Sequence, residues 1–416
     1  MTGRGPIAEA IHGFVDAGQL AGAATLVWRA GQAAQADVIG WRDIDARLPV
    51  ERDTIFRIAS MTKPVTSVAV LTMVEEGCFA LGDPIDRWAP EFARMRVLRS
   101  PDGPLDQTEP AARPITFEDL LTHRAGLTYA DFRRGPVGAA YARALGPNID
   151  NPLDPEAWIA ALAGMPLIDQ PGATFHYSHA TDLLGLILAR IDGVPLGDVL
   201  QRRVFGPLGM TDTGFQVPWE DQSRRAAAHG FDDADRLVRL DAVPGGHALP
   251  QRPDGMTFQS GGQGLWSTLD DYLAFARLFV EGGAVDGARV LQPETVALMA
   301  SNHLTDDQRA RSGILGMPIF AAGHGFGLGV AVVTEPGKAD ASLCGGGLGA
   351  VGWPGAYGGW WRADPGDRSV LIFLTHNMVG LEQMSRGVGM GVYGARAAFQ
   401  RLASGAYQSS PASISA

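Results

Sequence analysis

The sequence predicts an α+β fold, in which strands from both ends of the chain form one domain and helices between them form another. Two observations support this prediction. The segment from about 80 to 250 reads as helical stretches separated by Pro- and Gly-rich loops. Apolar runs of strand length flank it, at 21–29, 33–41, 326–334, 349–363 and 369–375. Strands at both termini with helices between them indicate one domain that holds an inserted one.

The domain boundaries follow from the same pattern. We predict an α/β domain made of residues 1–80 and 250–403 and a helical domain made of residues 81–249. Residues 404–416 are rich in Ser and Ala, and a tail of this composition is expected to be disordered. A small-molecule site is commonly found in the cleft between two such domains.

The elements at the start of the chain have clear signals. The runs 21–29 and 33–41 are separated by Ala30-Gly31-Gln32, which predicts a β-hairpin. Residues 60–76 then carry apolar side chains at helical spacing, and Gly77 is a stop signal. Pro64 falls in the first turn of this helix, where a missing backbone N–H costs little.

Later elements are less regular. Residues 100–114 and 135–155 are Pro- and Gly-rich and are expected to be loops, whose conformation the sequence does not define. The last third returns to strand-like runs, and a final helix is expected over about 381–402.

Composition excludes several classes of protein. The chain has 416 residues, of which 46% are hydrophobic and 19% charged, as expected for a globular protein with a sizeable core. A net charge of −11 and the lack of a basic run argue against nucleic acid or an anionic membrane as the main partner. With only Cys78 and Cys344, no disulfide framework is implied.

Neither a signal peptide nor a membrane helix is expected. Residues 1–19 have no apolar core of the signal-peptide type. The longest apolar run, 67–74, is far shorter than the ~20 residues that a membrane helix needs. We therefore expect a cytoplasmic protein without a membrane partner.

Lysine is nearly absent from the sequence. Only two of the 34 basic residues are lysines, Lys63 and Lys338. Arginine serves equally well as ordinary surface charge, whereas only lysine can lose its proton near neutral pH when it is desolvated. A bias in base composition explains Lys338 equally well, but the neighbours of Lys63 favour a chemical role.

Ser60-Met61-Thr62-Lys63 is the first candidate for chemistry. Ser60 and Lys63 are three residues apart and share one face of the expected helix, so the lysine nitrogen can reach the serine oxygen. The helix N-terminus favours negative charge developing on Ser60, and the same dipole disfavours an ammonium on Lys63. Taken alone, Ser-x-x-Lys is also the pattern of an N-cap serine and a solvated lysine.

Two further segments add candidates. Tyr177 precedes an apolar helix that starts near Asp182, and it can act as a second proton-transfer group beside a cation. The alternative is a core tyrosine, with His179 a packed or capping histidine. The run Gly352–Gly359 contains four glycines, which in a strand often mark close approach of a ligand. There the Ala356 N–H can join the Ser60 N–H as an oxyanion donor, although a Gly-rich bend with aromatic core residues fits the composition too.

Several segments in order resemble the serine β-lactamase and penicillin-binding-protein superfamily, specifically the class C β-lactamase-like branch with its family VIII carboxylesterases. The resemblance runs from about Gly5 to Leu402. The matching segments are Phe56–Lys63, Leu120–Leu127, Pro171–Gly185, Pro207–Thr213 and Gly261–Thr268.

The resemblance implies a fold and a set of roles. The fold is β-lactamase/transpeptidase-like, an antiparallel sheet flanked by helices plus a mostly helical domain. Ser60 would be the acyl-forming nucleophile, with Lys63 and Tyr177 as the proton-handling pair. The N–H groups of Ser60 and Ala356 would form the oxyanion hole. The implied chemistry needs no cofactor and no metal.

The sequence departs from the lactamase pattern at two places. His179 stands where lactamases and peptidases of this group usually have the Asn of Tyr-x-Asn. Trp353-Pro354-Gly355 stands in place of Lys-Thr-Gly and resembles the Trp-x-Gly of the esterase branch. Losing that lysine removes a charge-assisted contact with a substrate carboxylate. We therefore expect His179, Trp353 and Gly355 to contact the substrate, Trp353 as an apolar wall for uncharged groups.

The predicted function is that of a carboxylesterase acting on small or short-acyl esters through an acyl-enzyme on Ser60. An acyltransferase, a weak β-lactamase or D-amino peptidase, and a non-catalytic acyl sensor remain alternatives. A Ser-His-Asp hydrolase is disfavoured because no Gly-x-Ser-x-Gly occurs, and a zinc hydrolase because no His-Glu-x-x-His occurs. The natural substrate and the oligomeric state are not defined by the sequence.

Overall fold

The computed structural model describes residues 5–29, 31–133, 135–240, 248–249, 252–314, 317–320 and 323–405. Eight strands of this part form one antiparallel sheet in the order β14-β15-β16-β17-β18-β1-β2-β3. Their bounds are β1 Gly22–Arg29, β2 Gln32–Asp43, β3 Leu48–Pro49, β14 His324–Phe326, β15 Ala331–Val333, β16 Val351–Gly352, β17 Trp360–Asp364 and β18 Ser369–Leu374. The first hairpin pairs with the last strand, so both ends of the chain build this sheet, as predicted.

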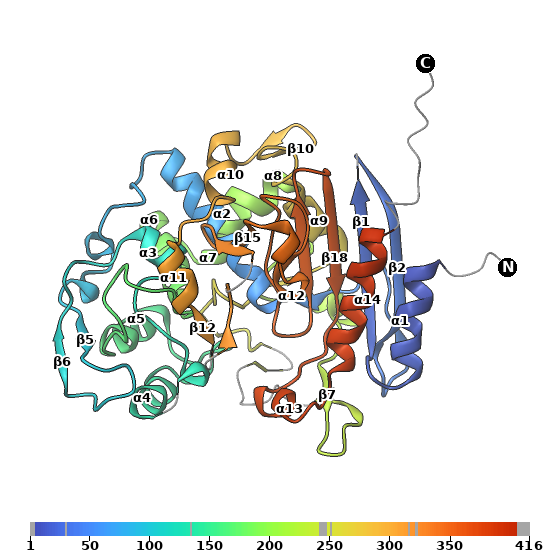
Figure 1. The fold of residues 1–416 in the computed structure, drawn as a ribbon, viewed down its shortest axis with the longest axis horizontal. Coiled ribbons are helices and arrows are strands. Elements are labelled where there is room, and N and C mark those ends of the chain that lie inside the picture. The colour runs from blue at the N-terminus through green and yellow to red at the C-terminus, as the bar shows by residue number, and fades with distance from the viewer. Residues whose placement is uncertain are drawn as a thin grey trace.

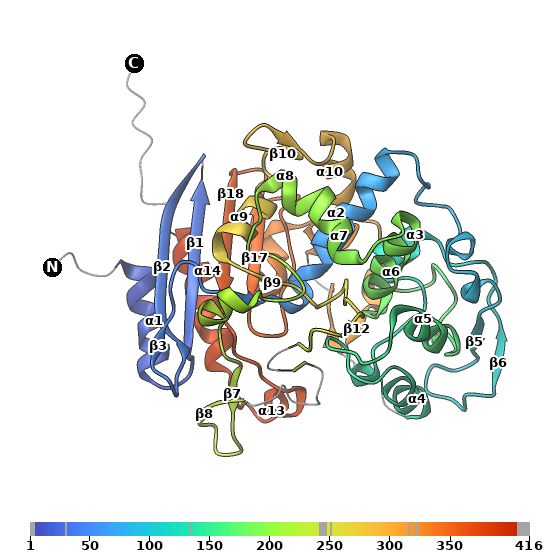
Figure 2. The same ribbon diagram turned by 180° about the vertical axis from the view of Figure 1, so that it is seen from behind.

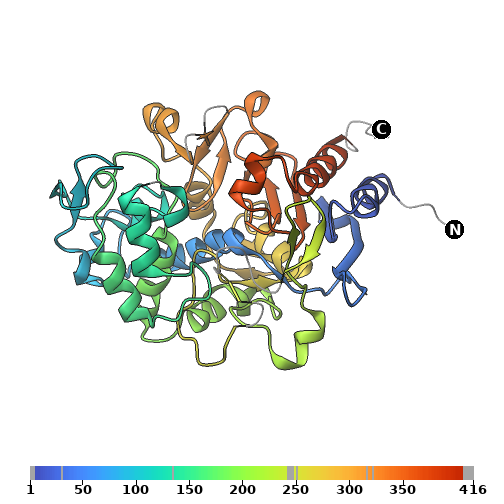
Figure 3. The ribbon, with the colours of Figure 1, turned by 90° about the horizontal axis from the view of Figure 1, so that it is seen from below.

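Helices cover both faces of the sheet. On one face α1 (Pro6–Asp16) packs beside α14 (Gly391–Gly405), where Ile11, Phe373 and Phe399 share one buried cluster. On the other face α9 (Leu269–Arg277) packs against β17 and β18. α1 and α14 lie at the end of the molecule opposite to α4 and α5 (Figures 1 to 3).

The longest regular elements in the middle of the chain are helices, as the sequence predicts. Helices α3, α4, α5 and α6 lie at the far end from the first hairpin in Figures 1 and 2, while α7 and α8 lie nearer the middle of the molecule. Their bounds are α3 Phe117–Leu121, α4 Pro136–Leu145, α5 Pro155–Ala163, α6 Ala180–Asp192, α7 Leu196–Leu200 and α8 Gly206–Leu208. Between the two regions runs α2 (Thr62–Glu75), whose residues 62–73 are all buried.

Shorter elements complete the described part. The short strand pairs are β4 (Phe56–Arg57) with β9 (Trp266–Ser267), β5 (Arg96–Leu98) with β6 (Thr108–Pro110), β7 (His229–Phe231) with β8 (Leu237–Arg239), β10 (Ala284–Val285) with β11 (Ala288–Arg289), and β12 (Gly313–Ile314) with β13 (Met317–Pro318). The remaining helices are α10 (Pro293–Met299), α11 (Asp306–Arg311), α12 (Ala341–Cys344) and α13 (Leu381–Ser385). Within the described ranges, no helix combines the length and apolar character needed to cross a membrane.

Some predicted elements differ in detail. The stretch 135–155 is not a plain loop, because Pro136 begins α4 at a position where proline needs no N–H partner. The run 326–334 is two strands, joined by a tight turn in which the Gly327 N–H donates to the Val330 carbonyl and Gly329 has φ +90°. The final helix is broken between α13 and α14, where Gly387 and Gly389 have positive φ.

Residues 404 and 405 belong to α14, while residues 406–416 of the predicted tail lie outside the described residues, as does Ala30 of the predicted turn. The division into 1–80 with 250–403 and 81–249 stays a prediction. The β7–β8 hairpin falls within 81–249, and its His229 N–H donates to the His376 carbonyl beside β18.

Candidate active site

Ser60 lies where a strand turns into the central helix. β4 pairs with β9, and the Ile58 N–H donates to the Leu265 carbonyl just beyond the pair. Ala59 then takes a left-handed conformation with φ +45°, which is strained for a residue with a Cβ. The 3-10 turn Ala59–Met61 leads directly into α2, so Ser60 lies at the start of the helix, as predicted.

Lys63 is fully buried beside Ser60. Its Nζ lies 3.3 Å from Ser60 Oγ and donates a 2.9 Å hydrogen bond to the Gly262 carbonyl. The same nitrogen lies 4.5 Å from the centre of the Tyr177 ring. Lys63 Nζ therefore lies close both to the Ser60 hydroxyl and to the ring of Tyr177, which comes from a distant segment of the chain.

Tyr177 comes from the segment just before α6 and packs against Trp353, which follows β16. The Trp353 indole N–H donates a 3.0 Å hydrogen bond to the Tyr177 hydroxyl, and the two ring centroids lie 5.2 Å apart. Both side chains are almost completely buried. Trp353 thus contacts the candidate proton-transfer tyrosine.

The structure places Gly355 against the backbone that leads to Ser60. A Cβ built on Gly355 would lie 2.5 Å from the Ile58 carbonyl oxygen, so only glycine allows this approach. Ala356 follows in an exposed turn. The backbone just before Ala356 therefore runs beside Ile58, and the oxyanion-donor role of the Ala356 N–H stays a prediction.

His179 has mainly internal contacts. It is buried at the N-terminus of α6, its Nδ1 lies 2.9 Å from Asp182 Oδ2, and its ring stacks edge-on against Tyr129 with centroids 4.2 Å apart. The substrate contact predicted for His179 stays a prediction.

Asp182 is a buried carboxylate that the sequence reasoning did not assign to the site. It accepts hydrogen bonds from the Ser260 hydroxyl and the Gly262 N–H in addition to the contact with His179. Burial alone would raise the pKa of Asp182, but hydrogen bonding and charge from His179, with Lys63 and Ser260, outweigh burial and lower it. Gly262 links this carboxylate to Lys63, since its carbonyl accepts from Lys63 Nζ.

His123 and Tyr129 also border the site and were missed as functional candidates. His123 has φ +54°, and its Nδ1 lies 3.2 Å from Ser178 Oγ. Burial, and after it the nearby charge of Lys63, lowers the pKa of His123. Burial, then the charge of Asp182, raises the pKa of Tyr129. Tyr129 lies two residues after the Leu120–Leu127 motif, and that position was its only signal.

A cleft of about 480 Å³ opens beside Tyr177. It combines apolar and charged walls. Its lining residues are Pro101, Asp102, Thr128, Phe132, Arg133, His176, Tyr177, Arg311, Gly313 and Ile314. Among the residues that the structure describes, no group of three or more His, Cys, Asp or Glu side chains is arranged to hold a metal ion.

The chain is similar to known proteins along most of its length. A family model described as Beta-lactamase matches residues 7–387. Protein Rv1367c of Mycobacterium tuberculosis is 49% identical over 88% of each chain, and Esterase EstB of Burkholderia gladioli is 32% identical over 86% of each. The solved structure of EstCE1, described as a hydrolase with promiscuous acyltransferase activity, is 28% identical with a TM-score of 0.74, covering 95% of this chain and 98% of that one.

Proposed function

This chain belongs to the Beta-lactamase family, and from that premise we propose that it is a carboxylesterase that cleaves small or short-acyl esters through an acyl-enzyme on Ser60. It is a serine hydrolase of the esterase or acyltransferase kind, which its similarity to Esterase EstB supports. The observation that carries the proposal is the position of Lys63 Nζ, which lies 3.3 Å from Ser60 Oγ and 4.5 Å from the centre of the Tyr177 ring.

Acylation begins with attack of Ser60 Oγ on the ester carbonyl carbon while the Ser60 proton passes to the Lys63 and Tyr177 pair. Lys63 Nζ is within 3.3 Å of the oxygen that loses the proton. The carbonyl oxygen becomes an oxyanion, which the N–H groups of Ser60 and Ala356 stabilise. The bond to the leaving alcohol then breaks, and the alcohol takes the proton held by the pair.

Deacylation repeats these steps with water. The pair removes a proton from a water molecule, whose oxygen attacks the acyl carbon, and Ser60 Oγ leaves and is reprotonated. The products are a carboxylic acid and free Ser60. Asp182 is hydrogen-bonded to His179 and to the Gly262 N–H. It supplies a buried negative charge near Lys63 in both half-reactions.

Trp353 supports ester substrates over β-lactams. Its indole fills the place of a lysine that would attract a substrate carboxylate, and it is hydrogen-bonded to Tyr177. An apolar wall there suits an uncharged acyl or alcohol group. The cleft beside Tyr177 offers room for a short acyl chain along Phe132 and Ile314.

A kinetic panel tests the proposal. It uses p-nitrophenyl esters of increasing acyl length beside nitrocefin and a D-alanyl peptide. We expect the highest kcat/KM for a short-chain ester and much lower values for the other two. Ser60→Ala should lower ester turnover by on the order of 10³-fold or more. Ser67→Ala is the matched control, since Ser67 is a buried serine of α2, the helix that follows Ser60.

The panel has outcomes that exclude the proposal. Undiminished ester cleavage in Ser60→Ala rules out the mechanism. Nitrocefin turnover comparable to the ester rate favours a β-lactamase. Labelling of Ser60 by a fluorophosphonate without turnover of any ester favours a sensor.

The second candidate is an acyltransferase, which the described activity of EstCE1 favours. The same acyl-enzyme would then be attacked by an alcohol in place of water. Product analysis with and without an added alcohol separates the two. A transferase yields mainly the new ester at low alcohol concentration, whereas a hydrolase yields mainly the free acid.

A further inference from the structure

His123 follows helix α3 in a backbone conformation that usually belongs to glycine. Its N–H donates to the Leu120 carbonyl and the Arg124 N–H donates to the Asp119 carbonyl, which is the hydrogen-bond pattern of a Schellman helix end. The residue after such a helix end has a left-handed backbone, and His123 has φ +54°. Glycine or asparagine is favoured there because a Cβ is strained. A histidine at this position indicates that its side chain makes contacts that offset the strain.

His123 holds the residues on both sides of Tyr177. Its carbonyl accepts a 2.7 Å hydrogen bond from the His176 N–H. Its Nδ1 lies 3.2 Å from Ser178 Oγ, and the side chains of His123 and Ser178 are almost completely buried. The imidazole also packs beside Tyr177, with ring centroids 5.0 Å apart. One residue therefore fixes the backbone before and after Tyr177 and contacts its ring.

The imidazole of His123 is held in one orientation. Its centroid lies 5.5 Å from that of Phe175 and 5.7 Å from that of Phe326. Ser178 Oγ accepts a hydrogen bond from the Ala180 N–H at 3.3 Å, so its own proton is available to His123 Nδ1. Among the described residues, His123 Nε2 has no hydrogen-bond partner. Ser178 is therefore the polar contact that orients this ring.

Given the proposed function, on which this inference rests, we propose that His123 is a positioning residue that orients the Tyr177 hydroxyl toward the leaving oxygen of the ester. In acylation the bond between Ser60 Oγ and the acyl carbon forms, and the bond from that carbon to the alcohol oxygen breaks. The proton that left Ser60 passes from the pair of Lys63 and Tyr177 to the alcohol oxygen. Trp353 contacts the Tyr177 hydroxyl, whereas His123 holds the backbone and the ring.

The leaving group separates a positioning role from a loss of stability. A p-nitrophenolate leaves readily without a proton, whereas an alkoxide needs one. A misplaced Tyr177 should therefore slow acylation by an alkyl ester more than acylation by a p-nitrophenyl ester. The quantity to compare is kcat/KM, which reports the steps up to acylation. A smaller folded fraction would lower the rates of both esters equally.

Ethyl butyrate and p-nitrophenyl butyrate are the two probes, used with the full-length protein. His123→Gly keeps the left-handed backbone and removes the side chain. For this variant we expect kcat/KM to fall about tenfold for the ethyl ester and about twofold or less for the p-nitrophenyl ester. His123→Asn tolerates the same backbone and keeps a polar atom near the place of Nδ1, so it should restore most of the ethyl ester rate.

Ser178→Ala removes the partner of the imidazole. It should lower the ethyl ester rate in the same selective way as His123→Gly. Because the two residues act through one contact, the double variant should fall no further than the slower single variant.

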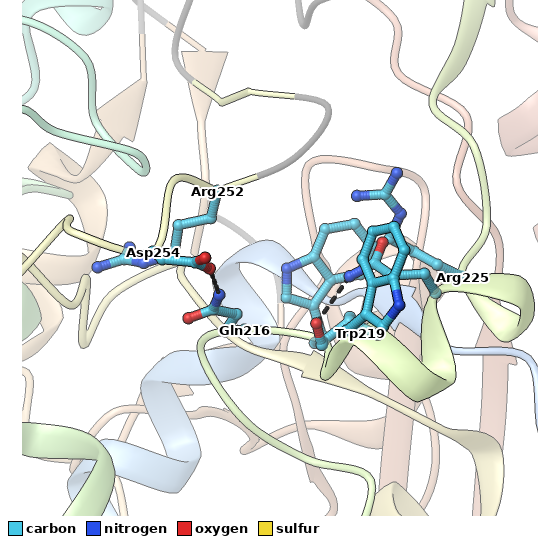
Figure 4. A pocket seen from close by; sticks show the side chains of 8 residues that line it. Gln216, Trp219, Arg225, Arg252 and Asp254 are labelled. Atoms are coloured by element: carbon cyan, nitrogen blue, oxygen red, sulfur yellow. Dashed lines mark hydrogen bonds between the residues drawn. The ribbon is translucent and has the colours of Figure 1, made fainter.

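Two control variants should leave the ratio of the two ester rates unchanged. Ser301→Ala is the matched control, since Ser301 Oγ lies 3.3 Å from His303 Nε2 in an exposed serine–histidine contact. Trp219→Phe changes a separate pocket, which Figure 4 shows and which shares no lining residue with the cleft beside Tyr177.

Several outcomes would overturn the positioning role and leave the proposed function intact. They are an equal loss for both esters in His123→Gly, no loss in Ser178→Ala, and additive losses in the double variant. If wild type cleaves neither ester, or Ser60→Ala cleaves both undiminished, the proposed function fails and the positioning role fails with it. The result of Ser178→Ala decides the question even if His123→Gly does not fold.

Discussion

The indole N–H of Trp353 donates a 3.0 Å hydrogen bond to the hydroxyl oxygen of Tyr177. This contact joins the segment after β16 to the segment before α6, and the Tyr177 ring centre also lies 4.5 Å from Lys63 Nζ, the neighbour of Ser60. The indole N–H orients the hydroxyl oxygen of Tyr177, so Trp353 positions a proton-transfer group in addition to lining the site.

Trp353→Phe should keep the aromatic wall and lose this donor. Because the donor acts on a proton-transfer group, we expect kcat for a short-chain ester to fall about tenfold with little change in KM. Trp41→Phe, on β2 and partly exposed, is the control. An equal effect of both substitutions, or a change confined to KM, would contradict the orienting role.

Lys63→Ala should remove the proton acceptor for Ser60. Esterase activity should fall by a factor on the order of 10³, while the exposed Lys338, replaced by Ala, should leave it unchanged. Since the sequence has only these two lysines, the pair of variants is a complete test of lysine function. A small effect of Lys63→Ala would exclude it as the base.

Asp182→Asn should destabilise the protein in a pH-dependent way. The pKa of Asp182 is lowered in the folded protein, so its stabilising effect is present above the ordinary carboxyl pKa and is lost as pH falls through the lowered value. At pH 7 we expect the free energy of unfolding to fall by ~3 kcal/mol. Urea unfolding should show this difference from wild type shrinking below about pH 4.

His376 and His229 should make the protein sensitive to mild acid. Burial lowers the pKa of His376 to about 3 and that of His229 to about 4. The unfolded chain takes up these protons near pH 6.5, before the folded protein does. The free energy of unfolding should therefore decrease, for each histidine, by about 1.4 kcal/mol per pH unit as pH falls from about 6 to 4. Urea titrations of His376→Phe should show a smaller slope, with His12→Gln as the control.

The two cysteines should differ in reactivity. Cys78 is exposed, whereas burial raises the pKa of the Cys344 thiol well above its ordinary value. A thiol reagent should modify one cysteine in the native protein and both after denaturation, and Cys78→Ser should remove the native reaction. Rapid native labelling of Cys344 would contradict the observed burial.

Much of the secondary structure could be predicted from the sequence, because the residues that begin and end each element lie within or beside it. The hairpin around residue 31 and the helix with Pro64 and Gly77 each carry their own start and stop residues. The order of the sheet was not readable, since β18 pairs with β1 across more than 300 residues. The apolar residues of 326–334 predicted one continuous strand, and the turn at Gly329 is seen only in the backbone geometry.

The candidate site also contains residues that could be predicted from the sequence and residues that could not. Ser60 and Lys63 were predictable because helical spacing places them on one face. Asp182 was not, because a carboxylate in an apolar helix has no local sign of its distant donors at Ser260 and Gly262. Tyr129 was missed for the same reason, since its neighbours in space, His179 and Tyr177, are far along the chain.

The most direct test of the account is the intact mass of the protein during turnover of p-nitrophenyl acetate. An acyl-enzyme on Ser60 predicts a transient gain of one acetyl group, which is located on the peptide that contains Ser60. This gain should be absent in both Ser60→Ala and Lys63→Ala. Ester cleavage without any acetylated protein, or an acetyl group found on another residue that persists in Ser60→Ala, would contradict it.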